Sequence, residues 1–225
     1  EPLLVSINES GVMFRSVYDG ALIEFTPEKS MQYQMEIGAD INMAFDECTY
    51  HPATHEYAEK SMKRTHDWLT RCISYRSTHT HPEYQQYLYG IIQGSMYEDL
   101  RRQSAAFVTQ QPIDGVAIGG VSVGESKQDM RDQVAWIRDC LPTDKPVHLL
   151  GVGHIDDIID LVHHGIDTFD CVEPTRLARM GILIDLADLD KPVAQWKSHE
   201  IDITQNSYRA VTEKAIIGLA NNPLV

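Results

Sequence analysis

Between residues 27 and 181 the chain repeats one pattern five times: a short apolar run, a loop, and a segment with helical periodicity. The apolar runs are predicted as strands at residues 41–45, 87–92, 116–118, 147–150 and 168–172. Amphipathic helices are predicted at residues 54–75, 96–109, 127–140 and 154–164. Such alternation favours a parallel sheet with crossover helices. Because a closed (β/α)8 TIM barrel needs eight units, we expect an α/β fold that is either an incomplete TIM barrel, completed by residues outside this chain, or an open sheet.

Shorter segments flank these repeats. Residues 3–25 alternate apolar and polar side chains around two turn signals, which predicts a small N-terminal antiparallel β meander. Thr26 and Pro27 mark the start of a helix and Gly38 marks its end. After residue 181 the pattern changes, and a closing helix is predicted at Tyr208 to Leu219. We expect a chain that begins inside a longer protein and a single barrel domain whose parts are residues 1–26 (the meander), 27–181 (the β/α units) and 182–225 (a divergent C-terminal segment).

Charge and cysteine content narrow the class of protein. The net charge of −14, from 33 acidic and 19 basic residues, argues against wide non-specific binding to nucleic acid but allows a local basic patch. No apolar run approaches the roughly 20 residues that a membrane-spanning helix needs, so we expect no membrane contact. The four cysteines form no Cys-x-x-Cys pair, which is typical of reduced thiols in a cytoplasmic protein without a metal site.

Unusual residues follow all five predicted strands. They are Asp46-Glu47-Cys48, Gln93-Gly94, Gly119-Gly120, Gly151-Val152-Gly153 and Asp170. Parallel strands bring these ends to one edge of a sheet, where reacting groups gather. Glycines there admit a flat ligand close to the backbone, and an acid with an amide suits the hydrogen-bonding edge of a purine-like base. Taken singly, the glycine pairs are equally typical of plain turns, and a lone cysteine is more often a small buried hydrophobe.

The stretch from residue 167 to 179 combines an acid with two arginines. Asp170 stands where an apolar run stops, and Arg176 and Arg179 follow three residues apart. This pattern indicates an acid that works on a sugar or base beside a phosphate clamp. An aspartate that caps a turn, with two surface arginines, fits the local pattern equally well.

Five ordered motifs resemble one family, the bacterial tRNA-guanine transglycosylases, also called queuine tRNA-ribosyltransferases. The motifs are Phe45-Asp46-Glu47-Cys48, Gly90-Ile91-Ile92-Gln93-Gly94, Ala117-Ile118-Gly119-Gly120-Val121-Ser122-Val123-Gly124-Glu125, Leu150-Gly151-Val152-Gly153, and Phe169-Asp170-Cys171-Val172 with Pro174-Thr175-Arg176-Leu177-Ala178-Arg179. Their order and approximate spacing match over about residues 10–181. The resemblance implies a (β/α)8 barrel that exchanges guanine at the anticodon wobble position for a 7-deazaguanine, in queuosine biosynthesis.

The resemblance also implies roles for single residues. Asp170 would be the nucleophile that holds the ribose covalently, as in a retaining glycosidase. The predicted substrate-binding residues are Asp46, Cys48, Gln93, Gly119, Gly120, Leu150 and Gly151. Of these, Leu150 would cover one face of the base. Arg176 and Arg179 would hold the tRNA anticodon loop, and Val123 would favour 7-aminomethyl-7-deazaguanine over the bulkier queuine. The expected partners are tRNA and the 7-deazaguanine base, and a homodimer is expected by resemblance.

Two features of the family are not found in this sequence. One is an upstream Ser-Gly-Gly-Phe-Gln-like segment with a second catalytic aspartate, and the other is a zinc subdomain built on Cys-x-Cys-x-x-Cys and a histidine. We therefore expect neither a catalytic cofactor nor the family's structural zinc site in this chain. Three alternatives stay open: a non-catalytic tRNA-binding paralogue or partner subunit, a DNA-modifying deazaguanine transglycosylase, and a hydrolase of small nucleosides that uses Asp170 as nucleophile.

Overall fold

The computed structural model describes residues 3–79, 84–184 and 200–205. It begins with a three-stranded antiparallel sheet of β1 (Leu4–Asn8), β2 (Gly11–Arg15) and β3 (Leu22–Phe25), in that order. Side-chain oxygens of Asn8 and Asp19 accept backbone N–H groups two residues ahead and so close the two turns. The predicted meander is confirmed.

Helix α1 (Pro27–Ile37) has the ends that its sequence predicts. The Thr26 hydroxyl accepts the backbone N–H of Lys29, and proline occupies the first turn. At the other end, Gly38 adopts a left-handed conformation with φ of 80°, and its N–H bonds to the carbonyls of Gln34 and Met35. Both ends are decided by contacts within a few residues, which explains the agreement.

The largest sheet has five parallel strands in the order β4-β5-β6-β7-β8. These are β4 (Ile41–Met43), β5 (Tyr87–Ile92), β6 (Gly115–Ile118), β7 (Val147–Leu149) and β8 (Thr168–Phe169). The connecting helices are α2 (His55–Thr78), α3 (Glu98–Thr109), α4 (Lys127–Ile137) with the 3₁₀ turn η1 (Arg138–Cys140), and α5 (Ile155–Val162). Sequential strand order is the pattern of a singly wound barrel, whereas doubly wound sheets reverse their order at a switch point.

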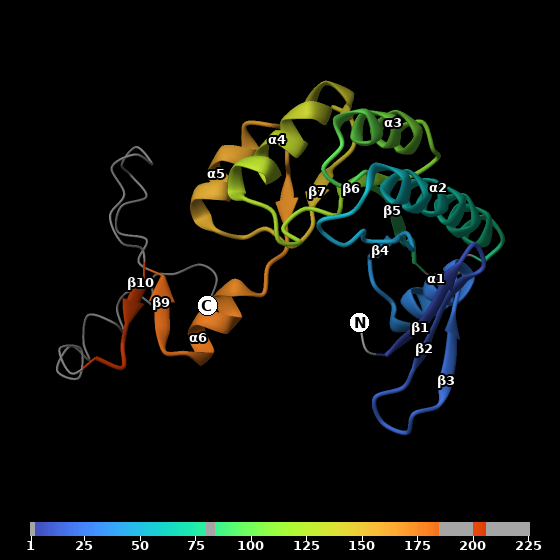
Figure 1. The fold of residues 1–225 in the computed structure, drawn as a ribbon, viewed down its shortest axis with the longest axis horizontal. Coiled ribbons are helices and arrows are strands. Elements are labelled where there is room, and N and C mark those ends of the chain that lie inside the picture. The colour runs from blue at the N-terminus through green and yellow to red at the C-terminus, as the bar shows by residue number, and fades with distance from the viewer. Residues whose placement is uncertain (1–2, 80–83, 185–199, 206–225) are drawn as a thin grey trace. The chain divides into compact units, whose positions relative to one another are not determined.

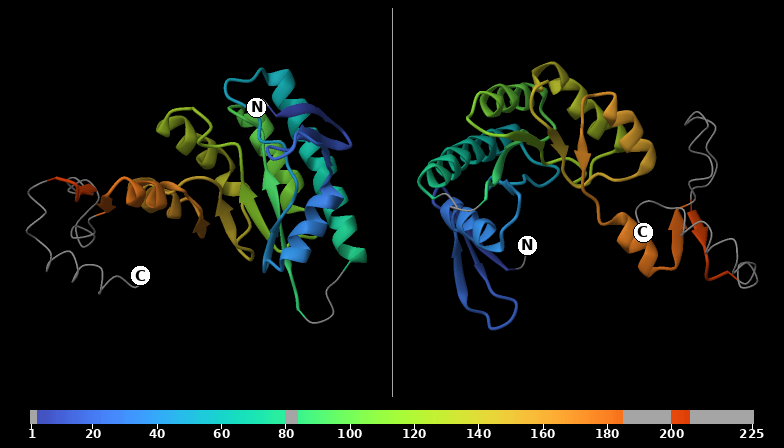
Figure 2. Two further views of the ribbon diagram at one scale, coloured as in Figure 1. Left: turned by 90° about the horizontal axis from the view of Figure 1, so that it is seen from below. Right: turned by 180° about the vertical axis from the view of Figure 1, so that it is seen from behind.

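Figures 1 and 2 show the sheet curling, with α2 to α5 along one side of it. Alternate strand residues face these helices and are fully buried: Leu88, Ile92, Val116, Ile118 and Leu149. The strand register places Ile91, Ala117 and His148 side by side on the opposite, inner face. The α/β prediction is confirmed, and the curled five-stranded sheet is consistent with an incomplete TIM barrel.

The strand ends differ from the sequence prediction. β4 ends at Met43 rather than at residue 45, because the next residues turn toward helix α2. There the ring of Phe45 stacks on Trp68 at 4.7 Å between centroids. β8 ends at Phe169 rather than at residue 172. Ladder pairing with a neighbouring strand decides where a strand stops, and hydrophobic runs do not carry that information.

Contacts divide the chain into two units, Glu1–Asp170 and Cys171–Val225. The second unit contains α6 (Glu173–Arg179) and an antiparallel pair of β9 (Ile182–Ile184) and β10 (Glu200–Asp202). The closing helix predicted at 208–219 lies outside the described residues, and the single barrel domain stays a prediction. Within the described ranges, no helix has both the length and the apolar character needed to cross a bilayer.

Candidate active site

Asp46 and Gln93 meet just past the ends of the neighbouring strands β4 and β5. Gln93 Nε2 donates to Asp46 Oδ2 at 2.6 Å. The Gln93 side chain is fully buried, and its Oε1 has no hydrogen-bond partner among the described residues. A buried acceptor without a partner is costly. The pair therefore presents a carboxylate and a spare amide oxygen to a ligand that carries donors.

The two adjacent acids after β4 have different surroundings. The Glu47 carboxylate is buried, pairs with Arg64 and accepts the hydroxyl of Tyr57 at 2.6 Å. Asp46 forms no ion pair with any described residue. Burial raises the pKa of Asp46 to about 6, and the hydrogen bond from Gln93 only partly offsets this. Glu47 is therefore part of the scaffold, whereas Asp46 is available to a ligand.

The turn Gly119-Gly120 lies against the Gln93 amide. A Cβ atom on Gly120 would stand 2.3 Å from Gln93 Oε1, and one on Gly119 would stand 2.7 Å from Gln93 Nε2. Gly120 also has a positive φ of 64°, which L side chains rarely adopt. Close approach requires both glycines, as the sequence predicted for a site that receives a flat ligand.

Arg101 of helix α3 holds this turn from behind and was not identified from the sequence. Its buried guanidinium donates to the carbonyls of Gly119 and Gly120, at 2.6 and 2.8 Å, and to Gln133 Oε1 at 2.6 Å. It also bonds the carbonyls of Ser95 and Ile92, at 2.8 and 3.4 Å. Burial lowers the pKa of Arg101 to about 10. An internal arginine on an otherwise amphipathic helix is the only sequence signal for this role.

Cys48 borders the same group of residues. It is exposed, and its pKa is raised by partial desolvation and by the nearby Asp46 carboxylate, while a backbone hydrogen bond from Gly120 opposes the rise. A raised pKa disfavours the thiolate, so Cys48 is suited to line a pocket rather than to act as a nucleophile. Asp46, Cys48, Gln93, Gly119 and Gly120 thus form one contiguous group.

Asp170 follows β8 at the same edge of the sheet. Its Oδ1 accepts the backbone N–H of Gly151 at 3.0 Å and lies 3.1 Å from His148 Nε2. The side chain is 58% exposed, so the carboxylate is open to a large substrate. His148 was also missed by sequence reasoning, although its position as the one polar residue of a short apolar strand could have revealed it.

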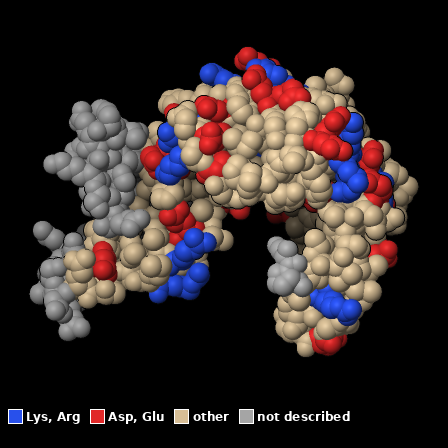
Figure 3. Space-filling model, viewed as in Figure 1, with Lys and Arg blue, Asp and Glu red and all other residues tan. Residues whose placement is uncertain are grey.

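The remaining predicted residues lie in loops or in the second unit. Leu150 is half-buried, directly before Gly151, and its N–H extends the sheet to the carbonyl of Ile118 at 3.1 Å. Val123 is exposed, in a loop whose backbone N–H groups are bound by the Glu125 carboxylate. Arg176 and Arg179 are exposed in the last turn of α6, where Figure 3 shows a basic patch.

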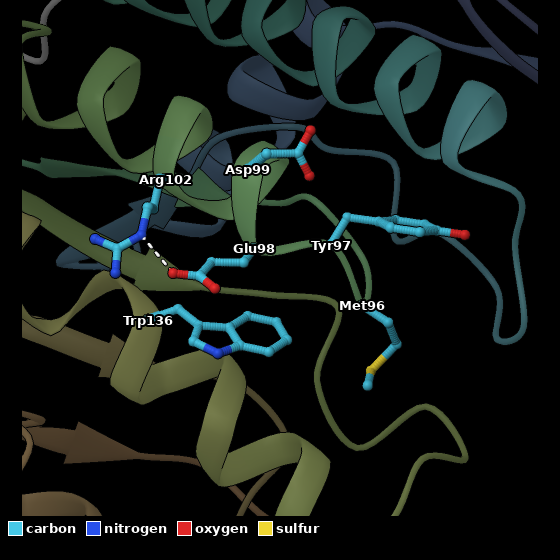
Figure 4. A pocket seen from close by; sticks show the side chains of 6 residues that line it. All are labelled: Met96, Tyr97, Glu98, Asp99, Arg102 and Trp136. Atoms are coloured by element: carbon cyan, nitrogen blue, oxygen red, sulfur yellow. Dashed lines mark hydrogen bonds and ion pairs between the residues drawn. The ribbon is translucent and has the colours of Figure 1, made fainter.

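Other parts of the described structure do not compete with this site. A pocket between α3 and α4 is lined by Met96, Tyr97, Glu98, Asp99, Arg102 and Trp136 (Figure 4), none of which is a predicted site residue. In the described ranges, no group of three or more His, Cys, Asp or Glu side chains could hold a metal ion. The prediction that the chain has no zinc site stays a prediction.

Chemically, the edge of the sheet offers two sets of groups. Asp46, Gln93 and the glycine turn supply acceptors and backbone groups that match the polar edge of a nucleobase. Asp170 supplies an exposed carboxylate that can attack an electrophilic sugar carbon. Both sets follow the carboxyl ends of parallel strands, which is where barrel enzymes place their reacting groups.

Comparison with known proteins gives consistent results. A family model described as Queuine tRNA-ribosyltransferase matches residues 2–214. The queuine tRNA-ribosyltransferase of Herpetosiphon aurantiacus is 48% identical over 177 residues, which cover 79% of this chain and 44% of that protein. The corresponding proteins of Psychrobacter cryohalolentis and Dechloromonas aromatica are 48% and 50% identical, over 82% and 79% of this chain and 47% of each relative. The chain thus spans slightly less than half the length of these curated relatives.

Proposed function

Because the chain belongs to the queuine tRNA-ribosyltransferase family, we propose that the protein is a tRNA-guanine transglycosylase. It exchanges the guanine at the anticodon wobble position of tRNA for a 7-deazaguanine, as a step in queuosine biosynthesis. The proposal makes it a pentosyltransferase that needs no cofactor for catalysis. All four cysteines are free thiols, which supports the reducing cytoplasm as its compartment.

The observation that carries this proposal is the hydrogen bond of 2.6 Å between Gln93 and Asp46 beside the turn Gly119-Gly120. Guanine and its 7-deaza analogues present N1–H and a 2-amino group as adjacent donors, which a single carboxylate accepts together. The carbonyl oxygen at position 6 of the base needs a donor, which the Gln93 amide or the backbone of the glycine turn supplies. Leu150 and Cys48 provide apolar contact around the ring.

The proposed reaction is a double displacement at the ribose. A carboxylate oxygen of Asp170 forms a bond to C1′ while the bond from C1′ to N9 breaks, and the electron pair leaves with guanine, which takes up a proton. The incoming base then attacks C1′ through N9, loses its N9 proton, and releases the Asp170 carboxylate. The exchange conserves protons and the glycosidic bond, and it retains the sugar configuration, as in retaining glycosidases.

The finer substrate assignment rests on the loop after Gly120 and on helix α6. We propose 7-aminomethyl-7-deazaguanine as the incoming base, because Val123 leaves less room than glycine for a ring on the aminomethyl arm. Arg176 and Arg179 hold the anticodon loop through its phosphates or neighbouring bases. The homodimer expected by resemblance stays a prediction.

The test is base exchange by the full-length protein. We expect it to incorporate labelled guanine into tRNA and to form a tRNA adduct that survives denaturation. Asp170→Asn is expected to abolish both, because a neutral amide is a poor nucleophile, whereas Asp139→Asn, which removes an exposed acid on η1, should retain both. An adduct at the wild-type level in Asp170→Asn would refute the assignment. Exchange into duplex DNA only, or tRNA binding without exchange, would support one of the two alternative functions.

A further inference from the structure

His148 lies between the strand that carries Asp170 and the centre of the sheet. The register pairs His148 of β7 with Thr168 of β8 and with Ala117 of β6, so its side chain is on the inner face. His148 Nδ1 lies 2.9 Å from the hydroxyl of Thr168, and Nε2 lies 3.1 Å from Asp170 Oδ1. The imidazole is only 13% exposed, whereas the Asp170 side chain is 58% exposed. A well-packed ring therefore holds an open carboxylate.

The two contacts determine which nitrogen carries a proton. An ionised carboxylate only accepts hydrogen bonds, so Nε2 of His148 must donate to Asp170. The Thr168 hydroxyl can donate to Nδ1 of a neutral ring or accept from Nδ1 of a charged ring. Thr168 therefore supports a donating Nε2 in either charge state. The arrangement resembles the histidine sites in which a second group fixes the ring orientation.

Both donors at Asp170 reach the same oxygen. The Gly151 N–H donates to Oδ1 at 3.0 Å, and His148 Nε2 lies 3.1 Å from that atom. Among the described residues, no hydrogen bond is made to Oδ2. The two carboxylate oxygens are thus not equivalent: one is anchored to β7 and the loop that follows it, and the other is directed away from these donors.

We propose that His148 is a positioning residue for the nucleophile, which anchors Oδ1 of Asp170 and leaves Oδ2 to form the bond to C1′ of the ribose. The inference rests on the proposed function, which makes Asp170 the nucleophile. In the covalent adduct, Oδ2 is the ester oxygen and Oδ1 is the ester carbonyl oxygen. When the incoming base attacks C1′, the electron pair of the C1′–Oδ2 bond returns to the carboxylate.

The donors at Oδ1 interact more strongly with the carboxylate than with the neutral ester, because hydrogen bonds to charged groups are stronger. They therefore assist departure of Asp170 in the second step, in the way that preorganised donors stabilise developing negative charge. Removing the His148 donor is expected to leave the carboxylate less restrained and a poorer leaving group. Turnover then slows, and the equilibrium between adduct and free tRNA shifts toward the adduct.

The experiment compares His148→Leu, which keeps the bulk of the side chain without a donor, with His148→Gln, whose amide Nε2 can occupy the place of the imidazole Nε2. For His148→Leu we expect kcat to fall roughly ten- to a hundredfold, the scale of removing one charge-assisted hydrogen bond. KM for the base should stay within about twofold. The ratio of trapped adduct to free tRNA, at fixed guanine concentration, should rise about fivefold. His148→Gln should recover most of each change.

Leu149→Val is the matched control, because Leu149 is the next residue of β7 and faces the helices. It should lower thermal stability without changing the adduct ratio. The inference is overturned if His148→Leu keeps the wild-type kcat and adduct ratio, if His148→Gln loses as much as His148→Leu, or if Leu149→Val reproduces the change in adduct ratio. Absence of any adduct in the wild-type protein would refute the proposed function and this inference together. A normal wild-type adduct with an unaffected His148→Leu variant would refute this inference alone.

Discussion

Gln93 donates one short hydrogen bond of 2.6 Å to Asp46, and this bond joins the loops at the ends of two neighbouring parallel strands. The bond keeps a half-buried carboxylate in place without neutralising it. Because no cation pairs with Asp46 in the described structure, a ligand with two adjacent donors can replace the solvent around it. The base site therefore depends on the protonation state of one residue.

The first prediction concerns pH. Burial raises the pKa of Asp46 to about 6, and only the ionised form can accept both donors of guanine. We expect base affinity to be constant above pH 6 and to fall by up to about tenfold per pH unit below it. Calorimetric titration of the protein with guanine between pH 4.5 and 8 measures this. Asp46→Asn should bind weakly at every pH, and an unchanged slope in that variant would assign the titration to another group.

The same raised pKa has the opposite sign for stability. The folded protein holds the Asp46 proton more tightly than the unfolded chain, whose aspartate pKa is near 3.9. The contribution of Asp46 to the free energy of unfolding is therefore fully present below pH 4 and is lost as pH rises through about 6. Thermal denaturation against pH should show a shallower decline over this range in Asp46→Asn than in the wild type.

The second prediction separates close approach from backbone strain. Gly120 and Gly165 both have positive φ, of 64° and 91°, but an added Cβ meets Gln93 only at Gly120. Both alanine variants should lose about 1–3 kcal/mol of stability through strain. Only Gly120→Ala should also raise KM for the base, by roughly tenfold or more, because the Gln93 amide must move. Equal KM values for the two variants would show that the turn does not position Gln93.

The third prediction concerns tRNA. Arg176→Ala and Arg179→Ala should weaken tRNA binding and lower its salt dependence, by about 0.7 in the logarithmic slope for each phosphate of a single-stranded loop that the variant no longer neutralises. Free-base affinity should change little. Filter binding at several salt concentrations measures both variants against Arg138→Ala, which removes an exposed arginine of η1. If base affinity collapsed while tRNA affinity held, the two assignments would be reversed.

The fourth prediction concerns the incoming base. Val123 should disfavour queuine, whose cyclopentenediol ring needs space, by about 1–3 kcal/mol or roughly tenfold or more in selectivity. Val123→Gly should relax this preference, and Val17→Gly, in the exposed loop between β2 and β3, should not. Competition between the two bases for release of labelled guanine from tRNA decides the matter. Equal use of both bases by the unmutated protein would remove Val123 as the determinant.

Several elements could be predicted because their signals are local. The Thr26 cap, the proline after it and Gly38 act within one turn of the helix, so the bounds of α1 follow from a few adjacent residues. The alternation of strands and helices likewise predicted a parallel sheet whose ends carry the polar residues. Strand lengths were less accurate, since β4 and β8 stop where pairing with a neighbour stops.

From the sequence alone came the family, the fold class and the set of residues at one edge of the sheet. Only the tertiary structure decided how those residues combine: Glu47 pairs with Arg64, while Asp46, its neighbour, bonds Gln93. It also brought His148 to Asp170 and Arg101 to the glycine turn. Caps and periodicities act between residues a few positions apart, whereas these contacts join residues 17 to 47 positions apart. Their geometry depends on sheet register and helix packing, which no local pattern specifies.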